Sequence, residues 1–281
     1  MRTRHLSGAG KAAVGRPDLQ PGSLRYQPIW NVQQKAISIY FGESAAQADA
    51  GADVGADVGA DVDPERLGCA DRELLRHVMV DIAAAARHRD VGSVCVPVHY
   101  ATLANAGPRG ELLALCDTIP ADLRVLLVWE IVGAPETIWE NALFPLVSTI
   151  KPYARAIFMR HALDQMDFDV PAAVGVHSVG IDLRDVTDSE TRCVGRLEQF
   201  AKCAHALGLR CHIHGLATSS MSLTAIGAGF DYVAGPAISG STEAPWGVLP
   251  YDAESLIRHN LAAAPARTAT NGPELSSSAA D

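Results

Sequence analysis

The chain of 281 residues is poor in aromatic residues, in basic charge and in long apolar runs. Its 23 Lys and Arg residues stand against 32 Asp and Glu residues, giving a formal net charge of -9. This acidic balance argues against a general nucleic-acid-binding surface. Because no stretch of about 18 apolar residues occurs, we expect no membrane span. The basic amino terminus has no apolar run behind it, so we expect no signal peptide.

Cysteine pairs of the CxxC type are missing as well. The six cysteines are widely spaced, and most lie in apolar segments. This distribution is typical of buried, reduced thiols in a cytosolic protein. Since 48% of the residues are hydrophobic, the chain can form a sizeable core. The composition therefore predicts a cytoplasmic globular protein.

Three segments lack the periodicity of a folded element. Residues 1–23 and 261–281 are predicted to be disordered tails, on composition. Residues 47–64 contain the sequence Gly-Ala-Asp-Val three times, and a glycine every four residues suits neither helix nor strand. Calcium loops space their oxygen ligands more closely. We therefore predict a disordered acidic insertion there.

The rest of the chain, residues 24–260, alternates apolar strands with amphipathic helices. The predicted strands are 24–32, 36–41, 93–100, 124–132, 155–161, 179–183, 210–216 and 232–238, of which the first two form a hairpin. The main helices are predicted at residues 71–89, 136–153 and 189–207. Buried strands that alternate with helices imply an α/β fold with a mostly parallel sheet. Eight such strands fit a closed, TIM-like (β/α)8 barrel better than an open sheet.

Polar side chains stand near the carboxyl ends of these strands, where barrel enzymes place their sites. They are His99, Glu130, Arg160, Asp182 and His214. Two imidazoles and two carboxylates among them (His99, Glu130, Asp182 and His214) could bind zinc, iron or manganese. The alternative is that half-solvated positions at a barrel mouth tolerate polar residues without binding anything. Spacing alone does not decide between the two.

The order of the strand motifs resembles that of the EAL family of cyclic-di-GMP phosphodiesterases. The motifs that carry the resemblance are Tyr26-Gln27-Pro28-Ile29, Glu130-Ile131-Val132, Val179-Gly180-Ile181-Asp182 and Gly229-Phe230-Asp231. It covers roughly residues 24–245. The resemblance implies an EAL-type barrel whose first two strands form a hairpin.

The same alignment places unusual residues at the family's metal-binding positions. The Glu of the Glu-Ala-Leu motif falls near Phe41, and only a bulge would bring Glu43 into its place. Arg160 aligns with the family's paired aspartates, and His214 with a glutamate. The resemblance implies that Glu130 and Asp182 are the acids that remain.

Hydrolysis of the family type needs two divalent ions, Mg²⁺ or Mn²⁺ in this family, held by several converging carboxylates. Too few carboxylates remain here, so the sequence predicts no cofactor and no catalytic residue. Three hypotheses stay open. The first is an inactive regulatory domain in bacterial signalling that binds another protein, with homodimerisation as an option. The second is a receptor that binds cyclic di-GMP without cutting it. The third is a phosphodiesterase or a repurposed metalloenzyme.

Overall fold

The computed structural model describes residues 24–44, 63–87, 91–245 and 247–263. The strands are β1 (Leu24–Asn31), β2 (Ala36–Ser44), β3 (Ser93–His99), β4 (Leu127–Val132), β5 (Ala156–Arg160), β6 (Ser178–Asp182), β7 (Arg210–His214), β8 (Tyr232–Ala234) and β9 (Leu249–Pro250). The helices are α2 (Pro64–Ala86), α3 (Tyr100–Ala104), α4 (Ala106–Asp117), α5 (Ala121–Arg124), α6 (Glu140–Ile150), α7 (Asp169–Ala173), α8 (Glu190–Ala206), α9 (Ser219–Ala228) and α10 (Ala253–Ala263). Short 3-10 turns, η1 and η2, cover Lys151–Tyr153 and Leu183–Asp185.

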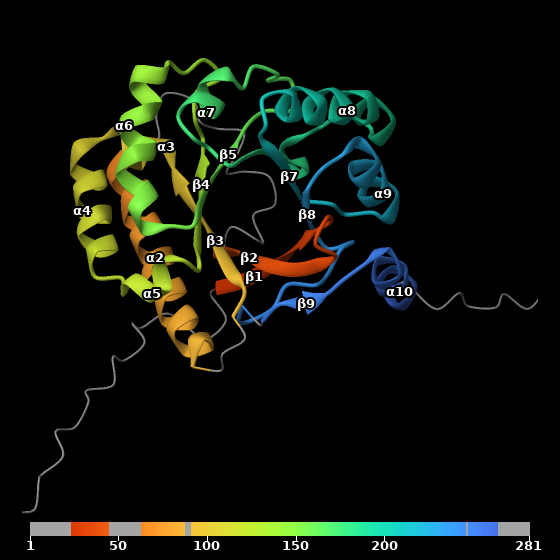
Figure 1. Ribbon diagram of the computed structural model, residues 1–281, viewed down its shortest axis with the longest axis horizontal. Coiled ribbons are helices and arrows are strands. Elements are labelled where there is room, and N and C mark those ends of the chain that lie inside the picture. Colours follow the sequence, from red (N-terminus) through yellow and green to blue (C-terminus); the bar gives the residue numbers. More distant parts are fainter. Residues whose placement is uncertain (1–23, 45–62, 88–90, 246, 264–281) are drawn as a thin grey trace, which may run out of the picture.

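Strands β1 to β8 close into a barrel, as the sequence predicted. Each strand from β2 to β7 pairs in parallel with the strand that follows it, and β1 closes the circle by pairing antiparallel with both β2 and β8. Helices α2 to α9 surround the strands (Figure 1). The β1–β2 hairpin therefore reverses one strand of an otherwise parallel barrel, and β9 pairs with the start of β2.

The side chains of each strand alternate between two cores, because successive residues of a strand point to opposite faces. The outward residues pack against the helices in the larger cluster, for example Val94, Ile157 and Ile213. The inward residues form a smaller cluster inside the barrel, which includes Phe41 and Phe158. Polar residues of the inward set therefore lie inside the barrel or at its rim.

Helix α2 begins seven residues earlier than the predicted residue 71. The Asp63 side chain accepts a hydrogen bond from the Glu65 backbone nitrogen at 3.0 Å, and Pro64 follows the cap. An aspartate cap followed by proline is a strong helix start. Asp63 and Pro64, which we assigned to the acidic insertion, thus belong to the folded domain. Residues 47–62 of that insertion lie outside the described residues.

The predicted boundaries differ from the structure at other places too. Residues 121–124 form the short helix α5, so β4 begins at Leu127 rather than at residue 124. Strand β7 ends at His214 rather than at residue 216, because Gly215 turns the chain with φ +76°. Helix α10 continues to Ala263, past the predicted start of the carboxyl-terminal tail at residue 261. The predicted tail at 1–23 and residues 264–281 lie outside the described residues.

No helix in the described part of the chain has both the length and the apolarity that a bilayer-spanning helix needs. The described cysteines are all free thiols, and four of the six are buried.

Candidate functional site

The carboxyl-terminal end of the parallel strands, here called the mouth, holds a buried network of charges. Seven residues form it, and we call them the mouth cluster: Glu43, Glu130, Arg160, Asp182, Arg184, His212 and His214. They come from β2, β4, β5, β6, β7 and the turn after β6. Four of the five predicted site residues are members, and His99 is not.

Glu130 lies at the centre of the mouth cluster and is fully buried. Its Oε1 accepts hydrogen bonds from Arg160 Nε at 2.9 Å and from His212 Nε2 at 3.2 Å. His214 Nε2 lies 3.3 Å from Oε2. Burial alone would raise the pKa of Glu130, but Arg160 and the two histidines hold it well below its usual range. Glu130 is therefore an ionised carboxylate inside the barrel.

Arg160 links Glu130 to Asp182. Its Nη1 donates a hydrogen bond to Asp182 Oδ2 at 3.2 Å, while its Nε donates to Glu130 Oε1. Asp182 also receives Arg184, whose Nη2 donates to Oδ2 at 2.7 Å and whose Nε lies 3.0 Å from Oδ1. Burial raises the pKa of Asp182, but the two arginines outweigh it and bring the pKa to about 2. Both ends of this carboxylate are thus paired with guanidinium groups.

Glu43 completes the chain of ion pairs. Arg184 Nη1 donates to Glu43 Oε2 at 3.1 Å, and Glu43 is buried. As expected from the sequence, Glu43 stands two residues beyond Phe41 on β2, and it nevertheless takes part in the mouth cluster. Pairing with β1 is regular from Ile39 to Ser44, and Phe41 and Glu43 share one face of β2 because they are two residues apart. Glu43 therefore reaches the mouth one step beyond Phe41.

Phe41 faces the interior and is itself part of the site. Its ring centroid lies 4.7 Å from that of His214, and the Arg160 guanidinium carbon lies 5.6 Å from the Phe41 ring centroid. A cation above an aromatic face is attracted by the ring. An apolar ring thus lies beside Arg160 at the position where the family alignment expects a metal-binding glutamate.

His212 fills space that Gly180 leaves open. A Cβ atom on Gly180 would lie 2.2 to 2.4 Å from three atoms of the His212 ring. The Ser178 hydroxyl lies 2.9 Å from His212 Nδ1, and Nε2 donates to Glu130. This arrangement fits a neutral imidazole with its proton on Nε2. Burial lowers the pKa of His212 to about 4, despite the nearby Glu130.

His99 makes a separate structural contact. Its Nδ1 lies 2.7 Å from Asp71 Oδ1 on α2, and its backbone nitrogen donates to Asp71 Oδ2 at 3.0 Å. The Thr102 hydroxyl donates to the same carboxylate at 2.6 Å. His99 therefore fastens the end of β3 to α2. The predicted set of four metal ligands is not formed, because its first histidine is turned to a different partner.

Two groups of three metal-binding side chains do converge within the described residues. At the mouth these are Glu130, His212 and His214, whose ligand atoms lie within 4.8 Å of one another. The second group, at the opposite end of the barrel, is His205, Cys211 and Asp231. The sequence analysis named neither set. The His-x-His spacing of β7 indicates the first set, because His212 and His214 lie on the same face of the strand. The second arginine of the mouth cluster, Arg184, was also missed, although it follows Asp182 by only two residues.

The residues at the mouth do not fit the two divalent ions of the family. Arg160 forms ion pairs with Glu130 and Asp182, and Arg184 forms ion pairs with Asp182 and Glu43. A cation would have to displace the partly buried guanidinium groups of Arg160 and Arg184, which would then lose their carboxylate partners.

Comparison with solved structures identifies the architecture. The Bacillus subtilis YkuI protein, which has an EAL domain and was solved with cyclic di-GMP and calcium, matches with a TM-score of 0.60 and 14% identity over 85% of this chain and 60% of that one. The EAL domain of Mycobacterium smegmatis DcpA matches with 0.57 and 12% identity over 86% and 99%. The Pseudomonas aeruginosa FimX EAL domain, solved with cyclic di-GMP, matches with 0.55 and 16% identity over 79% and 90%.

No family model matches the sequence, and no curated protein matches it significantly. The structural matches nevertheless share the barrel over most of the described chain. This chain therefore has the fold of an EAL domain, as the motif order predicted.

Proposed function

We propose that this chain is a catalytically inactive EAL-fold domain that regulates bacterial signalling by binding another protein. The observation that carries the proposal is the pairing of every acid of the mouth cluster with an arginine or histidine. Two-metal hydrolysis needs free, converging carboxylates. Here the guanidinium groups of Arg160 and Arg184 bind the carboxylate oxygens that would otherwise be free to bind metal ions.

Catalysis is tested directly with the purified full chain. Cyclic di-GMP is incubated with Mg²⁺ or Mn²⁺, and products are separated by chromatography. We expect no linear dinucleotide above the level of a matched incubation without protein. Metal-dependent turnover that is lost in a Glu130→Gln variant would overturn the proposal.

The surface at the start of α6 supports partner binding. Trp139 is 73% exposed and Phe144 54% exposed, and both line one open hollow together with Glu140 and Asn141. Exposed aromatic residues next to polar ones are typical of interaction surfaces, where Trp often carries much of the binding energy. We take this Trp139–Phe144 surface as the partner-binding face.

Affinity capture with Trp139→Ala tests this face. We expect specific partners of the unmodified chain to be lost with Trp139→Ala but retained with Leu223→Ala, which removes another exposed apolar side chain (55%) on α9. Sedimentation of the purified chain then separates a second copy of this chain from a different partner. Equal loss in both variants would reject this face as the binding surface.

A cyclic-di-GMP receptor is the second candidate, and Arg160 favours it. Its buried Nη2 has no hydrogen-bond partner among the described residues, so a phosphate oxygen could accept from it. The YkuI and FimX structures, which share this fold, both hold cyclic di-GMP. Calorimetry with cyclic di-GMP tests the idea. Absence of heat at high micromolar ligand rejects it. Binding that is lost in an Arg160→Met variant whose circular dichroism shows it to be folded would make it the better function.

A further inference from the structure

The amino-terminal end of the barrel carries a second group of reactive side chains, far from the mouth along the strands. His205 lies in the last turn of α8, Cys211 is the second residue of β7, and Asp231 directly precedes β8. We call these three the amino-end trio. The β7–β8 neighbourhood brings them together, although 26 residues separate the first from the last.

The ligand atoms of the amino-end trio form a compact triangle. His205 Nε2 lies 3.0 Å from Asp231 Oδ2 and 3.1 Å from Cys211 Sγ, and Sγ lies 3.7 Å from Oδ2. Zinc bonds of about 2.0–2.3 Å at tetrahedral angles place neighbouring ligand atoms about 3.4–3.6 Å apart. The three side chains thus already outline one face of a tetrahedron and need only small shifts.

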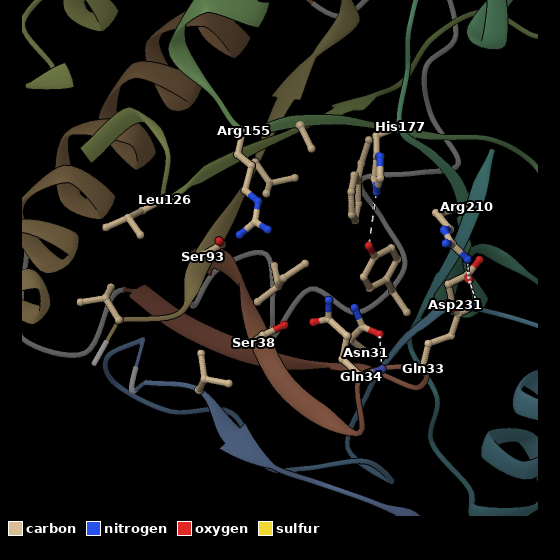
Figure 2. Close-up of a pocket in the computed structure, with 17 residues that line it drawn as sticks. Asn31, Gln33, Gln34, Ser38, Ser93, Leu126, Arg155, His177, Arg210 and Asp231 are labelled. Carbon is tan, nitrogen blue, oxygen red and sulfur yellow. Dashed lines mark hydrogen bonds and ion pairs between the residues drawn. The ribbon is translucent and has the colours of Figure 1, made fainter. Parts of the chain in front are cut away.

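The surroundings orient Asp231 for this role. Arg210 Nη1 and Gln33 Nε2 donate to Oδ1 at 2.8 and 2.9 Å, whereas Oδ2 accepts from the Cys211 backbone nitrogen at 2.9 Å and faces the other two side chains of the trio. Figure 2 shows Arg210, Gln33 and Asp231 at the edge of a cavity of about 500 Å³ at this end of the barrel. Hydrogen bonds to the second oxygen of a ligating carboxylate are a regular feature of metal sites.

We propose that His205, Cys211 and Asp231 form a zinc-binding site, with a solvent molecule as the fourth ligand. Thiolate, imidazole and carboxylate together are a donor set that zinc prefers. On binding, the Cys211 thiol releases its proton to solvent, and His205 binds through Nε2 with its proton on Nδ1. The +2 charge of zinc is then balanced by one thiolate and one carboxylate.

Burial and access both suit a metal with one open position. Cys211 and Asp231 are buried, whereas the His205 side chain is 41% exposed, so the trio opens to solvent on the histidine side. The mouth group of Glu130, His212 and His214 differs, because all three are buried and Arg160 holds Glu130 Oε1. Arg160 bonds to the same oxygen that faces His212 and competes there with a divalent cation, whereas Arg210 bonds to Oδ1 of Asp231 and leaves the trio oxygen Oδ2 to the other ligands. The amino-end trio is therefore the better metal site.

Cobalt spectroscopy tests the site, with Co²⁺ as a coloured substitute for zinc. The full chain is stripped with a chelator and titrated with CoCl2. We expect one equivalent to give strong visible bands of tetrahedral cobalt and a near-ultraviolet thiolate-to-cobalt band, and both disappear when ZnCl2 is added. Cys211→Ser should abolish the thiolate band, and His205→Ala should weaken cobalt binding at least tenfold.

Cys203→Ser is the matched control, since Cys203 is a half-buried thiol on the same helix as His205. It should leave the spectrum unchanged. Circular dichroism checks the fold of each variant, and if Cys211→Ser does not fold, His205→Ala decides the test because its side chain is 41% exposed. The proposal is overturned by a wild-type spectrum without a thiolate band, by a band that survives Cys211→Ser, or by an unchanged cobalt affinity in His205→Ala.

Discussion

At the mouth of the barrel, the central carboxylate of Glu130 is shared among Arg160, His212 and His214. At the amino-terminal end, Asp231 gives one oxygen to Arg210 and Gln33 and turns the other to His205 and Cys211. Both ends thus combine a buried acid, an arginine and histidine. At the mouth, Arg160 bonds to Glu130 Oε1, an oxygen that also faces His212. At the amino-terminal end, Arg210 bonds to Asp231 Oδ1, whereas the other two side chains of the trio face Oδ2. This difference decides which end is able to accept a cation.

The two ends of the barrel also differ in how their buried charged groups affect stability. Ion pairs inside a protein contribute little net stability, but removing one partner leaves an uncompensated charge and costs much more. The mouth cluster is a closed set in which every member depends on its neighbours. The amino-end trio is open on the His205 side. We therefore expect variants at the mouth to affect folding and variants at the trio to affect binding.

The largest effect is expected from Arg160→Met. It leaves Glu130 and Asp182 buried without their shared cation, which should lower the free energy of unfolding by about 3–5 kcal/mol. Urea denaturation measures the loss. Arg192→Met, at a side chain that is 79% exposed, is the control and should stay within about 0.5 kcal/mol of the parent. Adding Glu130→Gln to Arg160→Met should restore part of the stability, and a purely additive loss would contradict the coupling.

Acid should weaken the folded state through two buried histidines. Burial lowers the pKa of His161 and of His212 to about 4, from an ordinary value of 6.5. The unfolded chain then binds more protons between these values, so stability falls as the pH drops from about 6.5 to about 4, by up to about 3 kcal/mol for each histidine. The contribution of Asp182, with a pKa of about 2, is lost only below about pH 4.

Urea titrations across this pH range measure the slope. His212→Gln should make it shallower by about one proton, because the glutamine amide does not titrate. A stability that stays flat or rises between pH 6.5 and 4 would contradict the assignment of neutral buried imidazoles.

A smaller loss is expected from Gly180→Ala, which places a Cβ atom against the His212 ring. Overpacking of this kind typically costs about 1–3 kcal/mol. Gly195→Ala is the matched control, because its added Cβ in helix α8 meets no atom of the described residues within 4 Å, and it should stabilise by about 0.5–1 kcal/mol. Thermal denaturation compares the two. Equal effects would show that His212 does not need the space at Gly180.

The smallest effect is expected from His205→Ala in metal-free protein. Its side chain is 41% exposed and contacts Asp231 and Cys211 through Nε2 alone, so the free energy of unfolding should fall by no more than about 1 kcal/mol. Thermal unfolding with and without added ZnCl2 then sharpens the contrast between the two ends. Zinc should raise the melting temperature of the parent chain but not that of the variant. A shift of equal size in both would place the zinc elsewhere.

The barrel itself was predictable from local patterns. Alternating apolar strands and amphipathic helices, together with motifs such as Tyr26-Gln27-Pro28-Ile29, predicted the strand order and the closing hairpin. Strand ends predicted that Glu130, Arg160, Asp182 and His214 face one mouth. Boundaries were less predictable, since α2 starts at a cap, Asp63, that lies next to a low-complexity segment.

The neighbour that each polar side chain contacts was not predictable, because these contacts join residues far apart in the chain. Sequence order gives no sign that His99 binds Asp71, that Arg184 reaches Glu43 across the mouth, or that Gly180 leaves room for His212. Alternation along a strand fixes which face a side chain takes. It does not fix which of several neighbours that side chain contacts.

The sequence by itself determined the class of fold and the charge types at the strand ends, because periodicity and motif order are local properties. Only the tertiary structure decided how those charges are used. Closure of the barrel places Arg160 between Glu130 and Asp182, and it also brings His205 and Asp231 to Cys211 at the other end. A carboxylate acts as a metal ligand or as a partner of arginine according to its neighbours in space, and these are set by packing.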